Sequence, residues 1–181
     1  HKSSRGLGDV YKRQVLESNV SSNEYLMLQG GQFSKSRKHA VWLPSFLERY
    51  DPDSLRYYLT INMPETHDTD FRWEDFVDRT NNELIGTYGN FVHRVMTLTH
   101  RLADEGENPL SRYDSHEDFN REIESCQNLL DSAIESMERQ RFKEALRSIM
   151  GIAQVGNQVL QRATPWKYLQ SEESFDKEKS L

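Results

Sequence analysis

Cysteine and long apolar runs are the features that this 181-residue sequence most clearly lacks. Its single cysteine, Cys126, excludes an internal disulfide framework and a zinc site built on cysteines. No apolar run approaches the roughly 20 residues that a membrane-spanning helix requires, so we expect a cytoplasmic protein without a membrane partner. The six histidines include no pair four residues apart, and neither a Walker loop nor a Ser/His/Asp arrangement is present. The sequence therefore predicts no metal site.

Charge is unevenly distributed along the chain. Lysine and arginine total 23, and aspartate and glutamate total 29. The resulting net charge of −6 excludes a uniformly basic coat for nucleic acid, but it allows a local RNA-binding face. Residues 103–125 contain eight acidic residues and two arginines, so this stretch alone accounts for the net charge. We interpret it as a solvated connector and expect any phosphate-containing partner to bind elsewhere.

The first half of the chain predicts short elements. Residues 1–14 show no apolar periodicity and are interpreted as a foreign or disordered tail. Residues 25–28 have the composition of a strand, and residues 67–73 are expected to be extended. Short helices are predicted to begin near Pro44, near Asp53 as an N-cap, and at Trp73.

Apolar residues at helical spacing predict three long amphipathic helices in the second half of the chain. On the first helix, between about residues 82 and 102, they are Leu84, Tyr88, Phe91, Val95, Leu98 and Leu102. On the second helix they are Phe119, Ile123, Cys126, Leu130, Ala133 and Met137. On the third helix, which Pro165 is expected to end, they are Phe142, Ala145, Leu146, Ile149, Ile152, Ala153 and Val159. Three such helices predict an antiparallel bundle.

The segment Ser34-Lys35-Ser36 follows a pair of glycines and is the first candidate site. Glycines allow the backbone to approach a phosphate closely. Two hydroxyls and an ammonium can bind oxygens that gain charge when a bond to phosphorus breaks. A polar surface turn is the simpler interpretation of the motif taken alone.

Polar residues on the long helices form the second candidate site. Asn90 and Arg94 lie four residues apart at the rim of an apolar face, and together they can read the edge of a base. Trp166, after the predicted end of the third helix, can stack on an unpaired base. Asn157 and Gln161 can support such a site or form an ordinary polar face. Taken alone, the pair also fits a solvated helix flank, and the tryptophan fits the closed end of a core.

Taken together and in order, these segments resemble the C-terminal half of a methionyl-tRNA synthetase. The resemblance covers about residues 16–169 and rests on NEYLMLQGGQFSKSR, AVWLPSFLERYDPDSLRYYLTINMPETHDTDFRWEDF, NNELIGTYGNFVHRV and NQVLQRATPW. Several motifs in the correct order and spacing are far more specific than any one of them alone.

The resemblance implies roles for individual residues. In that family a Lys-Met-Ser-Lys-Ser loop closes the ATP site, which implies ATP binding by Ser34, Lys35 and Ser36, with Lys35 as the catalytic residue. Gln32 stands where the family has its first lysine, so one charge of the loop is missing here. The family's anticodon-reading residues correspond to Asn90, Arg94 and Trp166.

The resemblance also implies an organisation and a parent enzyme. The expected fold is mainly α, with a remnant of the class I catalytic and stem-contact region before an antiparallel anticodon-binding bundle that is incomplete. The expected segments are a tail at 1–14, the end of the catalytic domain with its ATP loop at 15–75, and the bundle at 76–181. The parent would be a methionine–tRNA ligase that uses methionine, ATP as its magnesium complex, and tRNA(Met). Its zinc-binding insertion and methionine pocket lie N-terminal in the family and outside this chain, so we expect no activity from the chain alone.

Two other interpretations remain open at this point. Another class I synthetase, such as those for valine, leucine or cysteine, shares the lysine loop and the helical bundle. The Asn90/Arg94 pair combined with Pro165-Trp166 disfavours it. A non-catalytic helical module that binds tRNA or another partner is the third interpretation. An upstream reading frame encoding a nucleotide-binding fold would favour the enzyme, and a natural start codon near residue 15 would favour the module.

Overall fold

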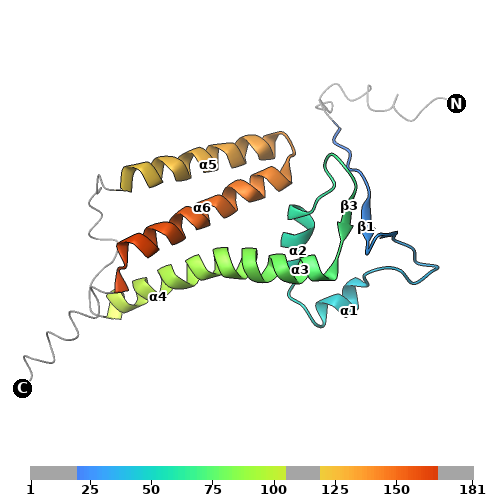
Figure 1. Ribbon diagram of the computed structural model, residues 1–181, viewed down its shortest axis with the longest axis horizontal. Coiled ribbons are helices and arrows are strands. Elements are labelled where there is room, and N and C mark those ends of the chain that lie inside the picture. Colours follow the sequence, from blue (N-terminus) through green and yellow to red (C-terminus); the bar gives the residue numbers. More distant parts are fainter. Residues whose placement is uncertain (1–19, 105–118, 167–181) are drawn as a thin grey trace, which may run out of the picture.

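The computed structural model describes residues 20–104 and 119–166, which form a small sheet followed by long helices (Figure 1). Most of the acidic stretch, the tail at 1–14 and the chain after Trp166 lie outside the described residues. Helices predominate in the described part, which confirms the predicted mainly α fold class.

A three-stranded sheet with strand order β2-β1-β3 lies at one end of the molecule (Figure 1). β1 (Leu26–Leu28) and β2 (Gly31–Gln32) pair antiparallel through a two-residue turn. The turn residues Gln29 and Gly30 have positive φ angles of 50° and 76°. A type I′ hairpin turn needs positive φ at both positions, and glycine adopts it without a steric cost.

The chain leaves the sheet after β2 and returns to it through two helices. α1 (Leu43–Leu47) and α2 (Pro52–Ile61) precede β3 (Thr69–Phe71), which pairs in parallel with β1. The side chain of Asp51 caps α2, because its carboxylate accepts the backbone N–H of Asp53 at 2.7 Å. The prediction that Asp53 is the cap was therefore wrong by two residues. Pro52 takes the first helical position, where a missing N–H costs nothing.

An aromatic core fills the space between the sheet, α1, α2 and α3 (Trp73–Arg79). Its buried members are Leu28, Phe46, Leu55, Tyr58, Phe71 and Phe76. The Tyr58 hydroxyl donates to the Asp75 carboxylate at 2.9 Å, and the Tyr58 ring meets Phe71 edge-on with centroids 5.0 Å apart. Burial, together with the bond to Asp75, raises the pKa of Tyr58 to about 12, so this core hydroxyl keeps its proton.

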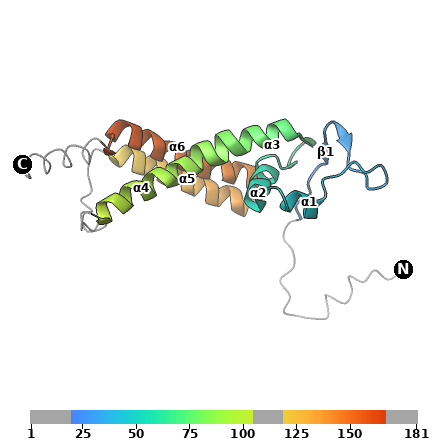
Figure 2. The same cartoon turned by 90° about the horizontal axis from the view of Figure 1, so that it is seen from below.

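α3 continues through a π-helical segment, η2 (Thr80–Gly89), into α4 (Asn90–Asp104), so that the three form one long rod (Figure 2). The sequence predicts an ordinary α-helix here. The π turns have room because Gly86 lacks a Cβ, which would lie 2.9 Å from the Asn81 carbonyl oxygen. A π turn holds an extra residue, so the predicted apolar stripe is displaced: Tyr88 is exposed, whereas Arg94 is half-buried.

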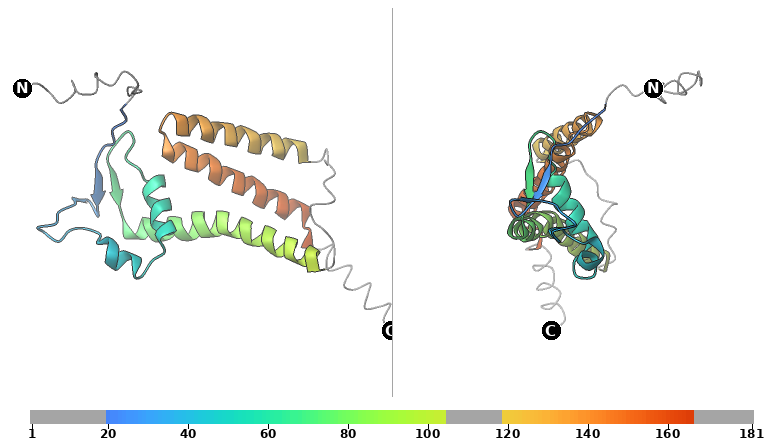
Figure 3. Two further views of the ribbon diagram at one scale, coloured as in Figure 1. Left: turned by 180° about the vertical axis from the view of Figure 1, so that it is seen from behind. Right: turned by 90° about the vertical axis from the view of Figure 1, so that its right-hand side faces the viewer.

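α5 (Asn120–Glu138) and α6 (Phe142–Ala163) form an antiparallel pair, and α6 lies between α5 and the η2–α4 rod (Figures 1 and 3). α4 and α6 run in the same direction, as an up-down-up arrangement requires. α6 ends at Ala163, two residues before Pro165, which confirms the predicted helix end.

The apolar face predicted for α5 is only partly the face that packs. Three of its members are largely exposed: Ile123 at 53%, Leu130 at 43% and Met137 at 51%. Ala133 and Ser136 are buried, and Leu129 lies over Gly151 of α6. Small residues allow two helices to approach closely, so α5 packs through a face that a count of large apolar residues does not select.

A second buried cluster connects the sheet end of the molecule to the long helices. It contains Tyr57, Ile61 and Met150, with Leu84 and Leu146 beside it. The backbone N–H of Lys143, in the first turn of α6, donates to the Glu65 carboxylate at 2.9 Å. Because α6 has no side-chain cap of its own, Glu65 satisfies one of its unpaired N–H groups and complements the positive end of the helix dipole.

Candidate functional site

A polar cluster lies where the η2–α4 rod meets α6, and Asn157 is at its centre. The Asn157 side-chain oxygen accepts a hydrogen bond from the Asn90 amide at 3.2 Å and another from the Arg94 guanidinium at 3.4 Å. Its NH₂ group donates to the Thr87 carbonyl oxygen of η2 at 2.9 Å. One amide therefore connects two helices and holds both residues that the sequence selected on the first helix.

Trp166 reaches the same cluster because the chain turns sharply after α6. Thr164 adopts the left-handed conformation, with φ of 43°, and Pro165 prevents the helix from resuming. In Figure 1 the chain at this point turns from α6 towards α4. The Arg94 guanidinium lies over the Trp166 ring, 5.0 Å from its centroid. The structure thus confirms that Asn90, Arg94 and Trp166 lie in one cluster, linked through Asn157 and Arg94.

The cluster lines a surface hollow of about 410 Å³. Its lining residues are Gly86, Thr87, Asn90, Arg94, Gln154, Asn157, Gln158 and Gln161. Amide side chains, which both donate and accept hydrogen bonds, dominate this set and suit the mixed donors and acceptors on the edge of a base. Sequence reasoning missed Gln154 and Gln158. Gln154 lies three residues before Asn157, and Gln158 lies three residues before Gln161. This helical spacing on α6 is the signal that would have found them.

The Ser34-Lys35-Ser36 segment forms a tight turn between β2 and α1. Ser34 and His39 exchange backbone hydrogen bonds of 2.8 and 2.9 Å across the turn. The hydroxyls of Ser34 and Ser36 lie 3.2 Å apart, and a ring nitrogen of His39 lies 2.7 Å from the Leu28 carbonyl oxygen of β1. The backbone of the turn is thus fastened to the sheet, while the Lys35 side chain is exposed.

The turn and the polar cluster lie far apart in the molecule. The segment between β2 and α1 is at the sheet end, whereas α4 and α6 extend to the opposite end (Figure 1). The structure therefore brings Asn90, Arg94 and Trp166 together but does not bring Lys35 to them. Two separate sites are needed to explain the two motifs.

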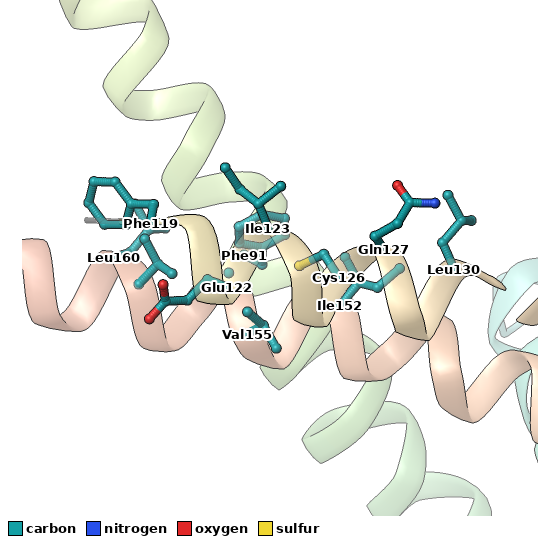
Figure 4. A pocket seen from close by; sticks show the side chains of 12 residues that line it. Phe91, Phe119, Glu122, Ile123, Cys126, Gln127, Leu130, Ile152, Val155 and Leu160 are labelled. Carbon is teal, nitrogen blue, oxygen red and sulfur yellow. The ribbon is translucent and has the colours of Figure 1, made fainter. Parts of the chain in front are cut away.

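An apolar hollow of about 510 Å³ lies between α5 and α6, with the Phe91 ring from α4 at its floor (Figure 4). Cys126, predicted as a core residue, is half-buried at this hollow. The one carboxylate in the lining, Glu122, bonds to Arg162 at 2.6 Å, which lowers the pKa of Glu122. This lining offers few groups that could orient a polar ligand.

Two further features concern metals and membranes. Within residues 20–104 and 119–166, no three His, Cys, Asp or Glu side chains gather as a metal site would require. In the same part of the chain, no helix combines the length and apolar character needed to cross a membrane.

Comparison with known proteins relates the chain to one family of enzymes. A sequence model of the family "tRNA synthetases class I (M)" matches residues 8–96. The chain is 42% identical over 158 residues to the methionine–tRNA ligase of Porphyromonas gingivalis, which covers 84% of the chain and 22% of that protein. The corresponding ligase of Methanobrevibacter smithii is 41% identical over 152 residues, covering 84% of the chain and 23% of that protein. That of Roseiflexus sp. is 38% identical over 168 residues, covering 93% of the chain and 27% of that protein. The chain thus spans about a quarter of the length of these relatives.

Proposed function

The chain belongs to the methionyl-tRNA synthetase family, and from this we propose that it forms part of an enzyme that activates methionine with ATP and transfers it to tRNA(Met). The part present here would serve two steps at two places. The turn at Ser34–Ser36 would act on ATP, and the polar cluster would read the anticodon.

The proposed ATP function rests on how the turn presents its charge. Lys35 is exposed on a backbone that hydrogen bonds fasten to β1 and His39, so its ammonium can approach a ligand without a large ordering cost. Ser34 and Ser36 add two neighbouring hydroxyls. In this proposal Lys35 stabilises the charge that develops on the pyrophosphate end of ATP when the methionine carboxylate attacks the α-phosphorus.

The proposed anticodon function rests on the convergence of Asn90, Arg94 and Trp166, which is the single observation that carries it. Asn90 and Arg94 would pair with the edges of bases, and a wrong base would leave these polar groups without partners. Trp166 would stack on a base, with Arg94 covering one of its faces in the free protein. In the free protein Asn157 holds both Asn90 and Arg94, so the site is organised before RNA binds.

We also retain the proposed division of the chain into an ATP-loop and stem-contact region at 15–75 and an anticodon-binding bundle at 76–181. α3 crosses this boundary, so one continuous rod runs from the first region into the second. A rigid connection of this kind would keep the two sites at a fixed separation along one tRNA.

The test measures RNA binding to the 181-residue chain. An RNA hairpin with a CAU loop should bind more tightly than the same hairpin with a changed loop. Trp166→Ala should lower affinity by roughly 5- to 150-fold, because one base stacking interaction is worth about 1–3 kcal/mol. It should also remove most of the preference, because the base is then no longer held where Asn90 and Arg94 can contact its edge. Trp42→Ala, which removes an exposed tryptophan at α1, is the control and should keep the preference. Equal binding of both hairpins by the unmodified chain would contradict the proposed function.

A further inference from the structure

The π-helical segment η2 lies in the middle of the rod that leads from the sheet end to the polar cluster (Figure 2). It covers Thr80–Gly89 and ends directly before Asn90. π-helical segments inside α-helices are rare and are frequently found at functional sites. Each residue of an α-helix turns the chain by about 100°, so a segment that is wound differently changes the direction in which every later side chain points.

The side chains within and after η2 show this change of direction. Leu84 packs beside the buried cluster that connects the sheet end to the long helices. Tyr88 lies four residues later and would share that side of a continuous α-helix, yet it is 46% exposed. Asn90 and Arg94 reach Asn157 of α6 instead. The π form thus leaves an aromatic side chain in solvent and brings polar side chains to α6.

Side-chain hydrogen bonds hold η2 in this form. The Glu83 carboxylate accepts a bond from the Tyr57 hydroxyl of α2. The Thr87 hydroxyl donates to the Asn82 carbonyl oxygen, five residues earlier, at 3.1 Å. The Thr87 carbonyl oxygen accepts from the Asn157 side chain at 2.9 Å. The segment is therefore fixed near its middle by α2 and near its end by α6.

Gly86 makes this winding possible. A Cβ at position 86 would lie 2.9 Å from the Asn81 carbonyl oxygen, closer than real Cβ atoms come to other atoms. Gly86 is exposed, so this overlap concerns the winding of the helix rather than packing against another element. Alanine favours the α-helix more than glycine does. An alanine at this position would therefore favour the α form of the segment over the π form.

We propose that Gly86 is a positioning residue for the polar cluster: by allowing the π form of η2, it turns Asn90 and Arg94 towards α6. The proposal rests on the proposed anticodon function. In an α form of η2, α4 would be rotated about its axis by about 100° for each residue by which the two forms differ. Such a rotation would carry both side chains away from Asn157.

Gly86→Ala in the 181-residue chain tests the proposal, and Gly89→Ala is the matched control. The control adds the same methyl group to the same segment, but its Cβ would lie 3.4 Å from the Leu84 carbonyl oxygen, an ordinary van der Waals contact. Gly86→Ala should reduce the preference for a CAU hairpin over a changed loop at least about fivefold, because two base contacts are lost together. Gly89→Ala should keep the preference. Equal preferences in the two variants would overturn the proposal.

NMR of the Asn157 side-chain amide, without RNA, separates a rotated α4 from simple obstruction of the hollow that Gly86 lines. Gly86→Ala should move the Asn157 NH₂ resonances towards those of a solvent-exposed asparagine, because its bonds to Thr87 and Asn90 are lost. Gly89→Ala should leave them in place. Unchanged resonances in Gly86→Ala would overturn the proposal even if hairpin binding were weakened.

The same readout keeps the two proposals distinguishable. If the unmodified chain does not prefer the CAU hairpin, the anticodon proposal fails, and the Asn157 resonances alone decide whether Gly86 orients α4. If Gly86→Ala does not fold, as judged by circular dichroism, Tyr57→Phe replaces it, because it removes only the hydroxyl that holds Glu83. Tyr57→Phe should move the Asn157 resonances in the same direction by a smaller amount. Unchanged resonances in this variant would then overturn the proposal.

Discussion

Asn157 determines how the polar cluster is arranged. Its oxygen accepts from both Asn90 and Arg94, and its nitrogen bonds to the backbone of η2. An amide oxygen has two lone pairs, so it can serve two donors at once. Asn157 would not need to touch the RNA to matter, because it sets the positions of two residues proposed to do so.

Asn157→Ala should reduce discrimination between CAU and changed loops while leaving the fold intact. Removing bonds that are each worth about 0.5–1.5 kcal/mol would lower stability modestly and leave Asn90 and Arg94 without a fixed orientation. Asn128→Ala, which removes an exposed amide from α5 outside the hollow at the polar cluster, is the control. The measurements are hairpin affinities and the melting temperature. Undiminished discrimination in Asn157→Ala would show that the cluster does not depend on this amide.

Lys35→Ala should leave stability unchanged and slow methionine activation in a full-length protein that carries this turn. An exposed side chain contributes little to folding, within about 0.5 kcal/mol. Loss of a contact made in the transition state costs about 3 kcal/mol, or about a hundredfold in rate. Methionine-dependent pyrophosphate exchange measures the rate. Lys38→Ala removes an equal charge from the same turn and should have a smaller effect. Equal losses in the two variants would argue for a general electrostatic role of the turn.

At the scale of elements, α6 approaches α4 closely because Gly156 has no side chain. A Cβ at this position would overlap the Phe91 ring. The neighbouring Asn157 can therefore reach Asn90 and Arg94 only while the two helices remain this close. The contact is apolar, yet it controls the geometry of the polar cluster beside it.

Gly156→Ala should destabilise the chain although alanine favours helices. The gain in helix propensity is about 1 kcal/mol, and overpacking against a ring costs about 2–3 kcal/mol, for a net loss of about 1–2 kcal/mol. For a chain of this size that corresponds to a melting temperature lower by about 2–8 °C. Gly151→Ala is the matched control, because its Cβ would meet the flexible end of Leu129 at 3.3 Å. A stabilised Gly156→Ala variant would contradict the close approach.

Asp70 holds the turn of the β1–β2 hairpin. Its two carboxylate oxygens accept the Gly30 backbone N–H at 3.0 Å, and Arg72 bonds to it at 2.9 Å. The Gly30 N–H, followed by Arg72, holds the pKa of Asp70 below its ordinary value. The unfolded chain therefore takes up a proton at higher pH than the folded chain does. The contribution of the Asp70 carboxylate to the free energy of unfolding is fully present above the pKa of Asp70 in the unfolded chain, about 3.9. It is lost as pH falls through the lower pKa of Asp70 in the folded chain.

The Asp70→Asn chain should therefore be less stable than the unmodified chain at pH 7. The difference between their free energies of unfolding should become smaller below about pH 3.9. Urea midpoints measured from pH 7 down to pH 2.5 on both chains test this expectation. Asp78→Asn, on an exposed position of α3, controls for the loss of one negative charge. A difference that stays constant across the whole range would mean that ionisation of Asp70 does not support the turn.

At the scale of the whole molecule, the turn at Ser34–Ser36 belongs to the sheet end, and the polar cluster lies farther along the helices, where η2 and α4 meet α6 (Figure 1). The cluster of Tyr57, Ile61 and Met150 and the bond from Lys143 to Glu65 join the sheet end to the long helices. The chain spans about a quarter of the length of the relatives that it matches.

We expect the 181-residue chain alone to show no methionine-dependent pyrophosphate exchange. A single ammonium can stabilise charge only on substrates that other groups hold in place. The assay compares the chain with a heat-inactivated sample and with a full-length ligase as the positive control. Exchange clearly above the inactivated sample would show that the chain contains a complete active site.

Local patterns in the sequence determined much of this protein. They predicted the strand at residues 25–28, the turn that contains Lys35, the helix start at Trp73 and the helix end before Pro165. Each depends on the conformational limits of a few neighbouring residues, such as glycine and proline, which act without help from the rest of the chain.

Only the tertiary structure decided which helix faces pack against each other and how the residues of the polar cluster come into contact. Periodicity selected Ile123 and Leu130 as core residues, but they are exposed because α5 meets α6 through small residues. The π segment displaced the row of apolar residues predicted on the first long helix. This segment can form because Gly86 has no Cβ that would approach the Asn81 carbonyl oxygen. Bundle geometry alone did not guarantee that Trp166 reaches Arg94. The left-handed turn at Thr164 redirects the chain after α6, and the close approach of α6 to Phe91 at Gly156 brings α6 near α4, so that Trp166 reaches Arg94. The approach at Gly156 is a contact between residues far apart in the sequence, which local patterns do not specify.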